Sequence, residues 1–180
     1  MYKFYTAENP PHYKFKDHSG LIRSISWLDD DTGFVSSGWD ATIFMWKLSQ
    51  QTAVWEHKVK NVNYTCVTSY KQEGEKTGGH LVYATGTDKT IRELDGKVEK
   101  LRYEQPCALS QAVLMHNRRA IFTGVAEQNK PGSVQVLRYP YEKIFEIQAH
   151  ALPVERLRIS YDNSTLFSAG LDGTLCIFSI

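Results

Sequence analysis

Short runs of alternating apolar and polar residues, separated by polar turns, recur along this chain. In the first clear unit, residues 22–27 alternate in type, as a half-buried strand does, and residues 29–33 form a turn that contains aspartates and a glycine. A strand of small residues is expected over 34–38, followed by a tight turn and an alternating strand over 42–47. The period of two predicts an all-β chain of short strands.

The same unit returns at a nearly constant spacing. Its first position is occupied in turn by His18, Lys60, Gln105 and His150, which stand 42, 45 and 45 residues apart. A period of this length, with about four strands in each unit, is typical of the blades of a β-propeller. We therefore predict one propeller domain over residues 1–180, whose successive blades cover residues 18–59, 60–104, 105–149 and 150–180.

Residues 1–17 are expected to end a preceding blade, with strands at 1–5 and 11–16. Four blades are at the low end of the range for propellers. The segment 11–16 could complete the last blade and close a four-bladed ring. We favour a part of a larger propeller, with further blades outside this chain, because an open arc leaves apolar blade faces in water.

The residue types at fixed offsets in the first and last units resemble the WD repeat. Where that family has a hydrogen-bonded His–Ser–Asp–Trp chain, the first unit holds His18, Ser36, Asp40 and Trp46. The last unit keeps three of the four members, as His150, Ser168 and Asp172. Such a chain satisfies buried polar groups and holds three strands together. The second unit has lost it, since Ala84 and Leu94 replace the serine and the tryptophan.

Composition and charge narrow the class of partner. Hydrophobic residues make up 42% of the chain, charged residues 23%, and the formal net charge is +1, so neither nucleic acid nor a membrane surface is expected as a partner. No run is long and apolar enough for a membrane span, and the first residues lack the pattern of a signal peptide. The widely spaced Cys66, Cys107 and Cys176 fit small buried residues in a reducing compartment.

Serine, histidine and aspartate in one unit also raise the possibility of a hydrolase. A catalytic triad needs an exposed serine oxygen with a base and oxyanion donors beside it, whereas Ser36 falls inside a predicted strand. We therefore expect no catalytic residues, and keep a hydrolase using Ser36 or Ser168 only as an alternative. The chain also lacks metal-ligand spacing and glycine-rich phosphate motifs, so we expect neither a metal nor a cofactor.

Binding through the propeller face is the remaining possibility. The residues Trp39, Thr87 and Leu171 precede the turn aspartates of three units and are expected at equivalent places on one face. Loops from successive blades can together form a composite binding site on a rigid scaffold. Trp39 is the strongest candidate because large aromatic side chains anchor protein partners. The alternative is that Trp39 is buried against a neighbouring loop.

Several longer stretches resemble one family within the WD-repeat proteins. They are HSGLIRSISWLDDD, NYTCVTS, TDKTIRELD and YPYEKIFEIQAH, in this order along the chain. In most of residues 14–180 the sequence is similar to the distal part of the WD-repeat region of the cilia- and flagella-associated protein 57 family. The degenerate second and third units share in this likeness.

The resemblance implies a non-catalytic protein-interaction scaffold of the ciliary axoneme. It further implies a part in placing inner dynein arms and in ciliary motility, with other axonemal or microtubule-associated protein chains as partners. The implied location is the cilium or flagellum, and otherwise the cytoplasm. The alternative is an adaptor in another cytoplasmic complex, since the repeat alone does not select a partner.

Overall fold

The computed structural model describes residues 13–50, 52–71, 79–115 and 120–180. Within these residues the backbone forms four antiparallel sheets, as the alternating pattern predicts. The first sheet contains β1 (Ile22–Trp27), β2 (Gly33–Gly38), β3 (Thr42–Lys47) and β4 (Ala53–Lys58). The second contains β5 (Tyr64–Lys71), β6 (His80–Gly86), β7 (Thr90–Asp95) and β8 (Val98–Glu104).

The two remaining sheets have the same meander order. The third contains β9 (Leu109–Leu114), β10 (Ile121–Val125), β11 (Gly132–Arg138) and β12 (Glu142–His150). The fourth has three strands, β13 (Val154–Ile159), β14 (Thr165–Gly170) and β15 (Leu175–Ser179). In all four sheets each strand pairs with the next along the chain, so every sheet is one propeller blade.

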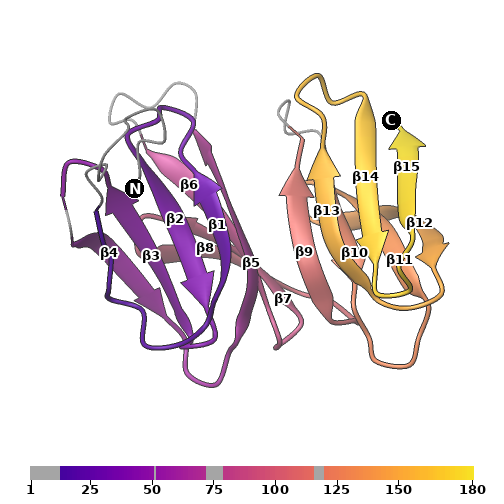
Figure 1. The fold of residues 1–180 in the computed structure, drawn as a ribbon, viewed down its shortest axis with the longest axis horizontal. Helices are drawn as coiled ribbons and strands as arrows, with labels where there is room; N and C mark the ends of the chain where they lie inside the picture. The colour runs from indigo at the N-terminus through magenta and orange to yellow at the C-terminus, as the bar shows by residue number, and fades with distance from the viewer. Residues whose placement is uncertain (1–12, 51, 72–78, 116–119) are drawn as a thin grey trace, which may run out of the picture.

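The four blades follow one another around an arc (Figure 1). The first strands of neighbouring blades are in contact, β1 with β5, β5 with β9, and β9 with β13. These innermost strands surround the middle of the molecule, with the first two blades on one side and the last two on the other (Figure 1). The result is the partial propeller that the repeat pattern predicts.

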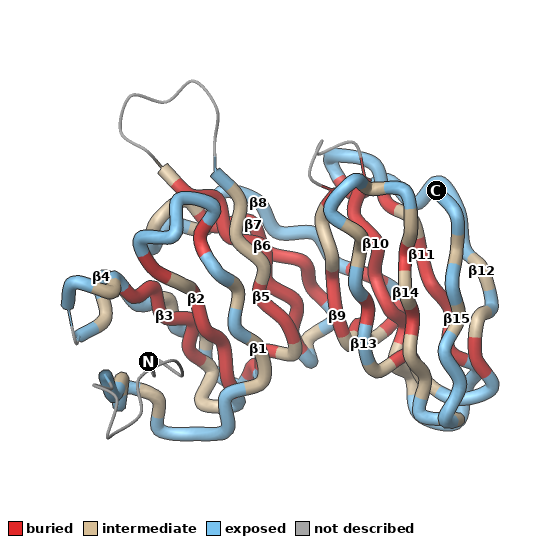
Figure 2. Tube along the Cα trace, turned by 45° about the horizontal axis from the view of Figure 1, so that its top comes forward, coloured by how far each residue is buried: buried red, intermediate tan, exposed pale blue. Residues whose placement is uncertain are grey.

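Three apolar clusters lie between successive blades and form the core. The cluster between the first and second blades contains Val35, Ile43 and Val82, which are fully buried. Figure 2 shows that buried positions gather on the second and third strands of the first three blades, while the outer strands are mostly exposed. Each fully buried aliphatic side chain contributes about 1.5–3 kcal/mol relative to an exposed one, so blade-on-blade packing dominates stability.

Both ends of the arc expose apolar side chains. On β1, Ser24 and Ser26 face the second blade, where the Ser26 hydroxyl lies 3.2 Å from that of Ser69. The alternate residues Ile25 and Trp27 are 61% and 47% exposed. At the other end, several side chains of the last strand are likewise exposed, as period-two alternation requires for a blade face without a neighbour.

The N-terminal segment differs from the expectation. Residues 13–16, the described part of the strand expected at 11–16, form no strand. Instead the Phe15 ring packs edge-on against Phe34 and Trp46, with ring centroids 5.1 Å apart in both cases. Phe15 thus covers the first blade, so these residues do not extend the last one. The strand expected at 1–5 lies outside the described residues.

Candidate functional site

His18, Ser36, Asp40 and Trp46 form a connected chain of hydrogen bonds in the first blade. His18 lies between β2 and the turn, with Nε2 2.7 Å from Ser36 Oγ and Nδ1 2.8 Å from Asp40 Oδ2. The indole Nε1 of Trp46, on β3, donates to the same Ser36 oxygen at 2.8 Å. The chain therefore joins the entering segment, the second strand, the turn and the third strand.

The geometry of this hydrogen-bonded chain favours a structural role. Burial acts to raise the pKa of Asp40, but hydrogen bonds from His18 and the Ser19 backbone outweigh it and lower the pKa. Asp40 is thus held as an acceptor. Ser36 is buried and its oxygen is occupied by the His18 and Trp46 contacts, which favours a structural role over that of a nucleophile.

In the last blade, one further residue enters the chain. His150 Nε2 lies 2.7 Å from Ser168 Oγ, as its counterpart does in the first blade. His150 Nδ1, however, lies 2.7 Å from the Thr174 hydroxyl, which donates to Asp172 Oδ1 at 2.7 Å. The direct separation of His150 Nδ1 and Asp172 is 3.4 Å. The Thr174 hydroxyl is the main cause of the low pKa of Asp172, about 2.

Sequence reasoning missed Thr174, although a signal was present. Threonine follows the turn aspartate by two residues in three units, at Thr42, Thr90 and Thr174. In the first blade the Thr42 hydroxyl donates to the Asp40 carbonyl at 3.1 Å instead. The repeated Asp-x-Thr spacing marks the turn, and short hydroxyl side chains commonly bond the backbone there.

The second blade replaces the histidine by an arginine from another strand. Arg92, on β7, has a fully buried side chain. Its guanidinium donates to Asp88 in the tight turn, and its Nε lies 3.2 Å from Glu99. Burial acts to raise the pKa of Asp88, but the Arg92 hydrogen bonds outweigh it and lower the pKa. The loss of histidine at Lys60 is therefore compensated by a buried ion pair, which sequence reasoning missed.

The described residues of the third blade form no equivalent chain. Gln105 and Thr123 stand at the histidine and serine positions and are buried. This blade is instead tied to the second one by Tyr141, whose hydroxyl donates to Glu93 at 3.0 Å. Both residues are buried, and burial together with the Glu93 charge raises the pKa of Tyr141.

All four turns on one face are held by the same backbone hydrogen bond. In the first blade the Trp39 N–H donates to the Leu21 carbonyl at 2.9 Å. The corresponding donors, at 2.9, 2.9 and 3.0 Å from their acceptors, are Thr87, Ala126 and Leu171. The three residues predicted on this face, which we call the turn face, therefore occupy equivalent places in three blades, and Ala126 is the fourth member.

The side chains of the turn face are accessible. Trp39 and Leu171 are 50% and 59% exposed, and Thr87 is exposed with its hydroxyl accepting from the Asn63 backbone. The guanidinium of Arg23 lies 5.5 Å from the centre of the Trp39 ring. Trp39 is thus not buried against a neighbouring loop, and a flat aromatic surface with a cation beside it is presented to solvent.

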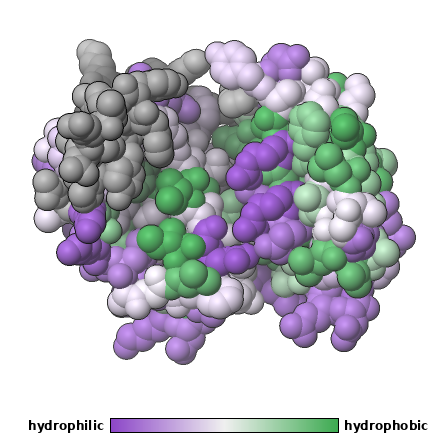
Figure 3. Space-filling view, viewed as in Figure 1, coloured by the Kyte–Doolittle hydropathy of each residue, from purple (hydrophilic) through white to green (hydrophobic). Residues whose placement is uncertain are grey.

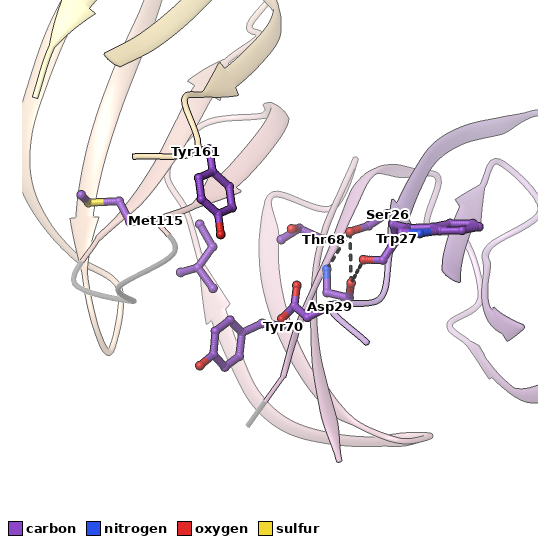
Figure 4. A pocket seen from close by; sticks show the side chains of 9 residues that line it. Ser26, Trp27, Asp29, Thr68, Tyr70, Met115 and Tyr161 are labelled. Carbon is purple, nitrogen blue, oxygen red and sulfur yellow. Dashed lines mark hydrogen bonds between the residues drawn. The ribbon is translucent and has the colours of Figure 1, made fainter. Parts of the chain in front are cut away.

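A pocket of about 660 Å³ lies at the other end of the innermost strands (Figure 4). Its lining includes Trp27, Tyr70, Met115 and Tyr161, which come from all four blades. Figure 4 shows Asp29 on the side of the pocket where Ser26 and Trp27 lie, and the Asp29 carboxylate accepts from the Lys71 backbone at 2.7 Å. We call this surface the far pocket.

The described residues contain neither a cluster of metal-ligating side chains nor a membrane-spanning helix. Among them, no three histidine, cysteine or acidic side chains are grouped so as to hold a metal ion. In the same part of the chain, no helix is long and apolar enough to cross a membrane.

Comparison with known proteins agrees with the architecture. The WD40 model, described as "WD domain, G-beta repeat", matches residues 9–47 and 141–179, which contain the two hydrogen-bonded chains. A crystal structure of the Myceliophteria thermophila Cps50 (Swd1) β-propeller domain superposes with a TM-score of 0.77 at 16% identity. The chain is part of a WD-repeat β-propeller. The match covers 92% of this chain but 54% of that one, as expected for a partial propeller.

Three relatives carry the same name. Cilia- and flagella-associated protein 57 A of Tetrahymena thermophila is 30% identical over 215 residues, covering 99% of this chain and 16% of its own length. Cilia- and flagella-associated protein 57 of Mus musculus is 29% identical, and the match covers 91% of this chain and 12% of that protein's length. Protein 57 C of T. thermophila is 28% identical, covering 100% and 15%. The resemblance to this family is confirmed, and the expected location in cilia or flagella agrees with these names.

Proposed function

We propose that this chain is a non-catalytic protein-interaction scaffold of the ciliary axoneme, with a part in placing inner dynein arms and so in ciliary motility. The relatives' names associate them with cilia and flagella, and the chain spans 12–16% of their length. Within so long a protein, a propeller segment contributes a rigid surface on which other chains assemble. Further blades outside this chain would complete the ring.

The observation that carries the proposal is the turn face. Its four members are fixed by backbone hydrogen bonds, so their side chains are free to serve binding. Among them, Trp39 combines half exposure with a neighbouring guanidinium, and tryptophan and arginine are enriched where protein interfaces concentrate their binding energy. Trp39, Thr87 and Leu171 are therefore proposed as the interaction face.

The test places the tagged full-length protein in a ciliated cell and follows its recovery with isolated axonemes. The expected result is axonemal recovery, crosslinking to inner dynein arm components, and loss of those crosslinks in Trp39→Ala. The matched control is Phe145→Ala, which removes an exposed aromatic side chain from the outer strand β12 and is expected to keep the crosslinks. Recovery of the protein in a different cytoplasmic complex would support the general adaptor instead.

A serine-reactive probe tests the remaining alternative, a hydrolase. Ser36 and Ser168 are both buried and each lies 2.7 Å from a histidine nitrogen inside its blade. We expect neither to be labelled in the folded protein. Labelling that is lost in Ser36→Ala or Ser168→Ala would overturn the non-catalytic proposal.

A further inference from the structure

Charged side chains meet where the innermost strands of the first and last blades face each other. Arg23, on β1, donates to Glu155 Oε1, on β13, at 3.3 Å. Arg156 donates to the same carboxylate oxygen at 2.9 Å. Figure 3 shows hydrophilic side chains along the middle of the molecule, with hydrophobic ones on both sides. One glutamate thus bridges the two ends of the arc.

This cluster has more positive charge and more donors than its own acceptors can use. Two arginines, Arg23 and Arg156, share one acidic partner, Glu155, and Arg158 lies on the same strand as Arg156. The Arg23 Nε is buried with no hydrogen-bond partner among the described residues, and Arg158 donates to the Leu157 carbonyl at 2.7 Å. Because each guanidinium carries five N–H donors, the cluster can accept further carboxylates.

A cavity runs beside these arginines. About 270 Å³ lies between the innermost strands, lined by parts of β1, β5 and β9 and by Arg158. It shares Ser26, Trp27 and Thr68 with the far pocket, so the two spaces adjoin. We call the combined space the central cavity. Its length along β1 suits a chain in extended conformation, in which each residue spans about 3.3 Å.

The walls of the central cavity fit an extended peptide. β1 and β13 are the edge strands of their sheets, so a peptide can add backbone hydrogen bonds along either edge. Val113 and Leu114, on β9, line this space, are only partly buried and can receive apolar side chains. Arg23, which lies beside Trp39, and Arg158, which lines the cavity, can receive carboxylates. Backbone, apolar and acidic recognition are therefore available together.

We propose that the central cavity binds an extended acidic peptide segment of a protein partner. Its carboxylates pair with Arg156 and Arg158 and displace Glu155 from Arg23. The inference rests on the proposed scaffold function and specifies the chemistry of the partner. Nucleic acid fits less well, because the whole chain carries a formal charge of +1 and Glu155 lies among the arginines.

Fluorescence anisotropy with a short labelled peptide tests this on the whole 180-residue chain. The peptide contains alternating glutamates and one central leucine, and the matched control peptide has glutamine at every glutamate. We expect binding of the acidic peptide only, weakening as salt is raised. The double variant Arg156→Gln/Arg158→Gln should weaken binding at least tenfold. Arg138→Gln, which removes an exposed arginine from β11, should leave it unchanged.

Glu155→Gln is expected to strengthen binding of the acidic peptide, whereas the arginine substitutions weaken it. It removes the carboxylate that competes for Arg23 and Arg156, so affinity for the acidic peptide should rise severalfold. A purely structural role of Glu155 would produce no gain. The side chains of Glu155, Arg156 and Arg158 are at least partly exposed. An unchanged thermal melt of each variant confirms that the fold is kept.

Two outcomes would overturn the inference. One is equal binding of the glutamine peptide, or unchanged binding by the arginine double variant. The other is equally tight binding of a single-stranded oligonucleotide of the same charge, which would indicate general attraction of polyanions. Either result leaves axonemal recovery of the full-length protein intact. Conversely, peptide binding without axonemal recovery would overturn the proposed function alone.

Discussion

At the scale of single residues, the turn aspartate of the first blade joins three other residues. Asp40 lies 2.8 Å from the His18 ring and accepts backbone hydrogen bonds from Ser19 and Thr42 at 2.9 and 3.3 Å. Its side chain is almost fully buried. Removing it leaves a buried ring nitrogen and two N–H groups without an acceptor, and such groups are costly to leave unsatisfied.

Asp40→Ala is therefore expected to lower the free energy of unfolding by about 1–3 kcal/mol. Urea denaturation followed by tryptophan fluorescence measures this change. Glu56→Ala, which removes an exposed carboxylate from β4 of the same blade, is the matched control and should change stability by less than about 0.5 kcal/mol. A loss for Asp40→Ala as small as that of the control would show that the hydrogen-bonded chain contributes little.

Asp30 predicts a dependence of stability on pH. Burial acts to raise its pKa, but hydrogen bonds from Thr32 and His80 outweigh it and lower the pKa to about 2. A carboxyl with a lowered pKa in the folded state contributes stability above its ordinary pKa of about 4. That contribution disappears as the pH falls from about 4 to about 2.

In Asp30→Asn the urea midpoint should consequently fall less between pH 5 and pH 2 than in the unmodified protein. Glu56→Gln serves as the control and should follow the unmodified protein. An identical acid profile for Asp30→Asn would mean that its contacts to Thr32 and His80 do not contribute.

The sequence allowed only part of the residue-scale geometry to be predicted. His18, Ser36 and Trp46 could be placed because their types and offsets are fixed by one repeated arrangement. Thr174 was missed because a threonine near a turn has several hydrogen-bonding choices, and Thr42 makes a different one at the same position. The choice depends on ångström-scale packing, which spacing does not contain.

At the scale of elements, the second blade shows that the repeat can keep its shape with different chemistry. Arg92 was missed because its partners, Asp88 and Glu99, come from the turn and from the neighbouring strand. Burying such a pair is costly in desolvation, and removing one member leaves the other without compensation. The blade therefore depends on Arg92 more than a charged residue in a strand would suggest.

Arg92→Leu is expected to lower the free energy of unfolding by about 2–3 kcal/mol, somewhat below the figure for a fully buried pair, because Asp88 and Glu99 are partly exposed. The double variant Arg92→Leu/Asp88→Asn should recover part of that loss. A double-mutant cycle by urea denaturation measures the coupling, expected to be about 1 kcal/mol or more. Strictly additive losses would contradict a direct interaction.

Strand positions were more predictable than side-chain networks. Alternation of residue types fixes which face of a strand is buried, and β1 to β3 fall where the pattern places them. The segment at 13–16 was misassigned as a strand, because its alternation arises from Phe15 packing on one blade face. Alternation of residue types shows that one side of a segment is buried. A β-strand also requires backbone hydrogen bonds to a neighbouring strand, which alternation alone does not show.

At the scale of the whole molecule, the two ends of the arc leave apolar surface in water. Ile25 and Trp27 are exposed at one end, and Leu175 and Ile177, 64% and 63% exposed, at the other. Among the described residues the last blade also has three strands, and no further strand pairs with the outer edge of β15. Exposed apolar faces and uncovered edges both favour association.

The isolated 180-residue chain is therefore expected to self-associate in light scattering at micromolar concentration. The variant Leu175→Thr/Ile177→Thr should shift the population towards monomer, because it removes apolar surface from one end while keeping β-branched side chains. Val98→Thr, on the exposed outer strand β8, is the control and should have no effect. A monodisperse monomer that melts cooperatively would favour a self-sufficient four-bladed unit.

The backbone hydrogen bond that holds each turn bears on how such a protein changes over generations. Because the backbone N–H of Trp39 and of its counterparts makes the hydrogen bond that holds the turn, the side chain at this position can be exchanged with little loss of folding stability. Tryptophan, threonine, alanine and leucine occupy it in the four blades. New contacts can thus arise one substitution at a time on an unaltered frame, and duplicated copies of the gene can acquire separate partners.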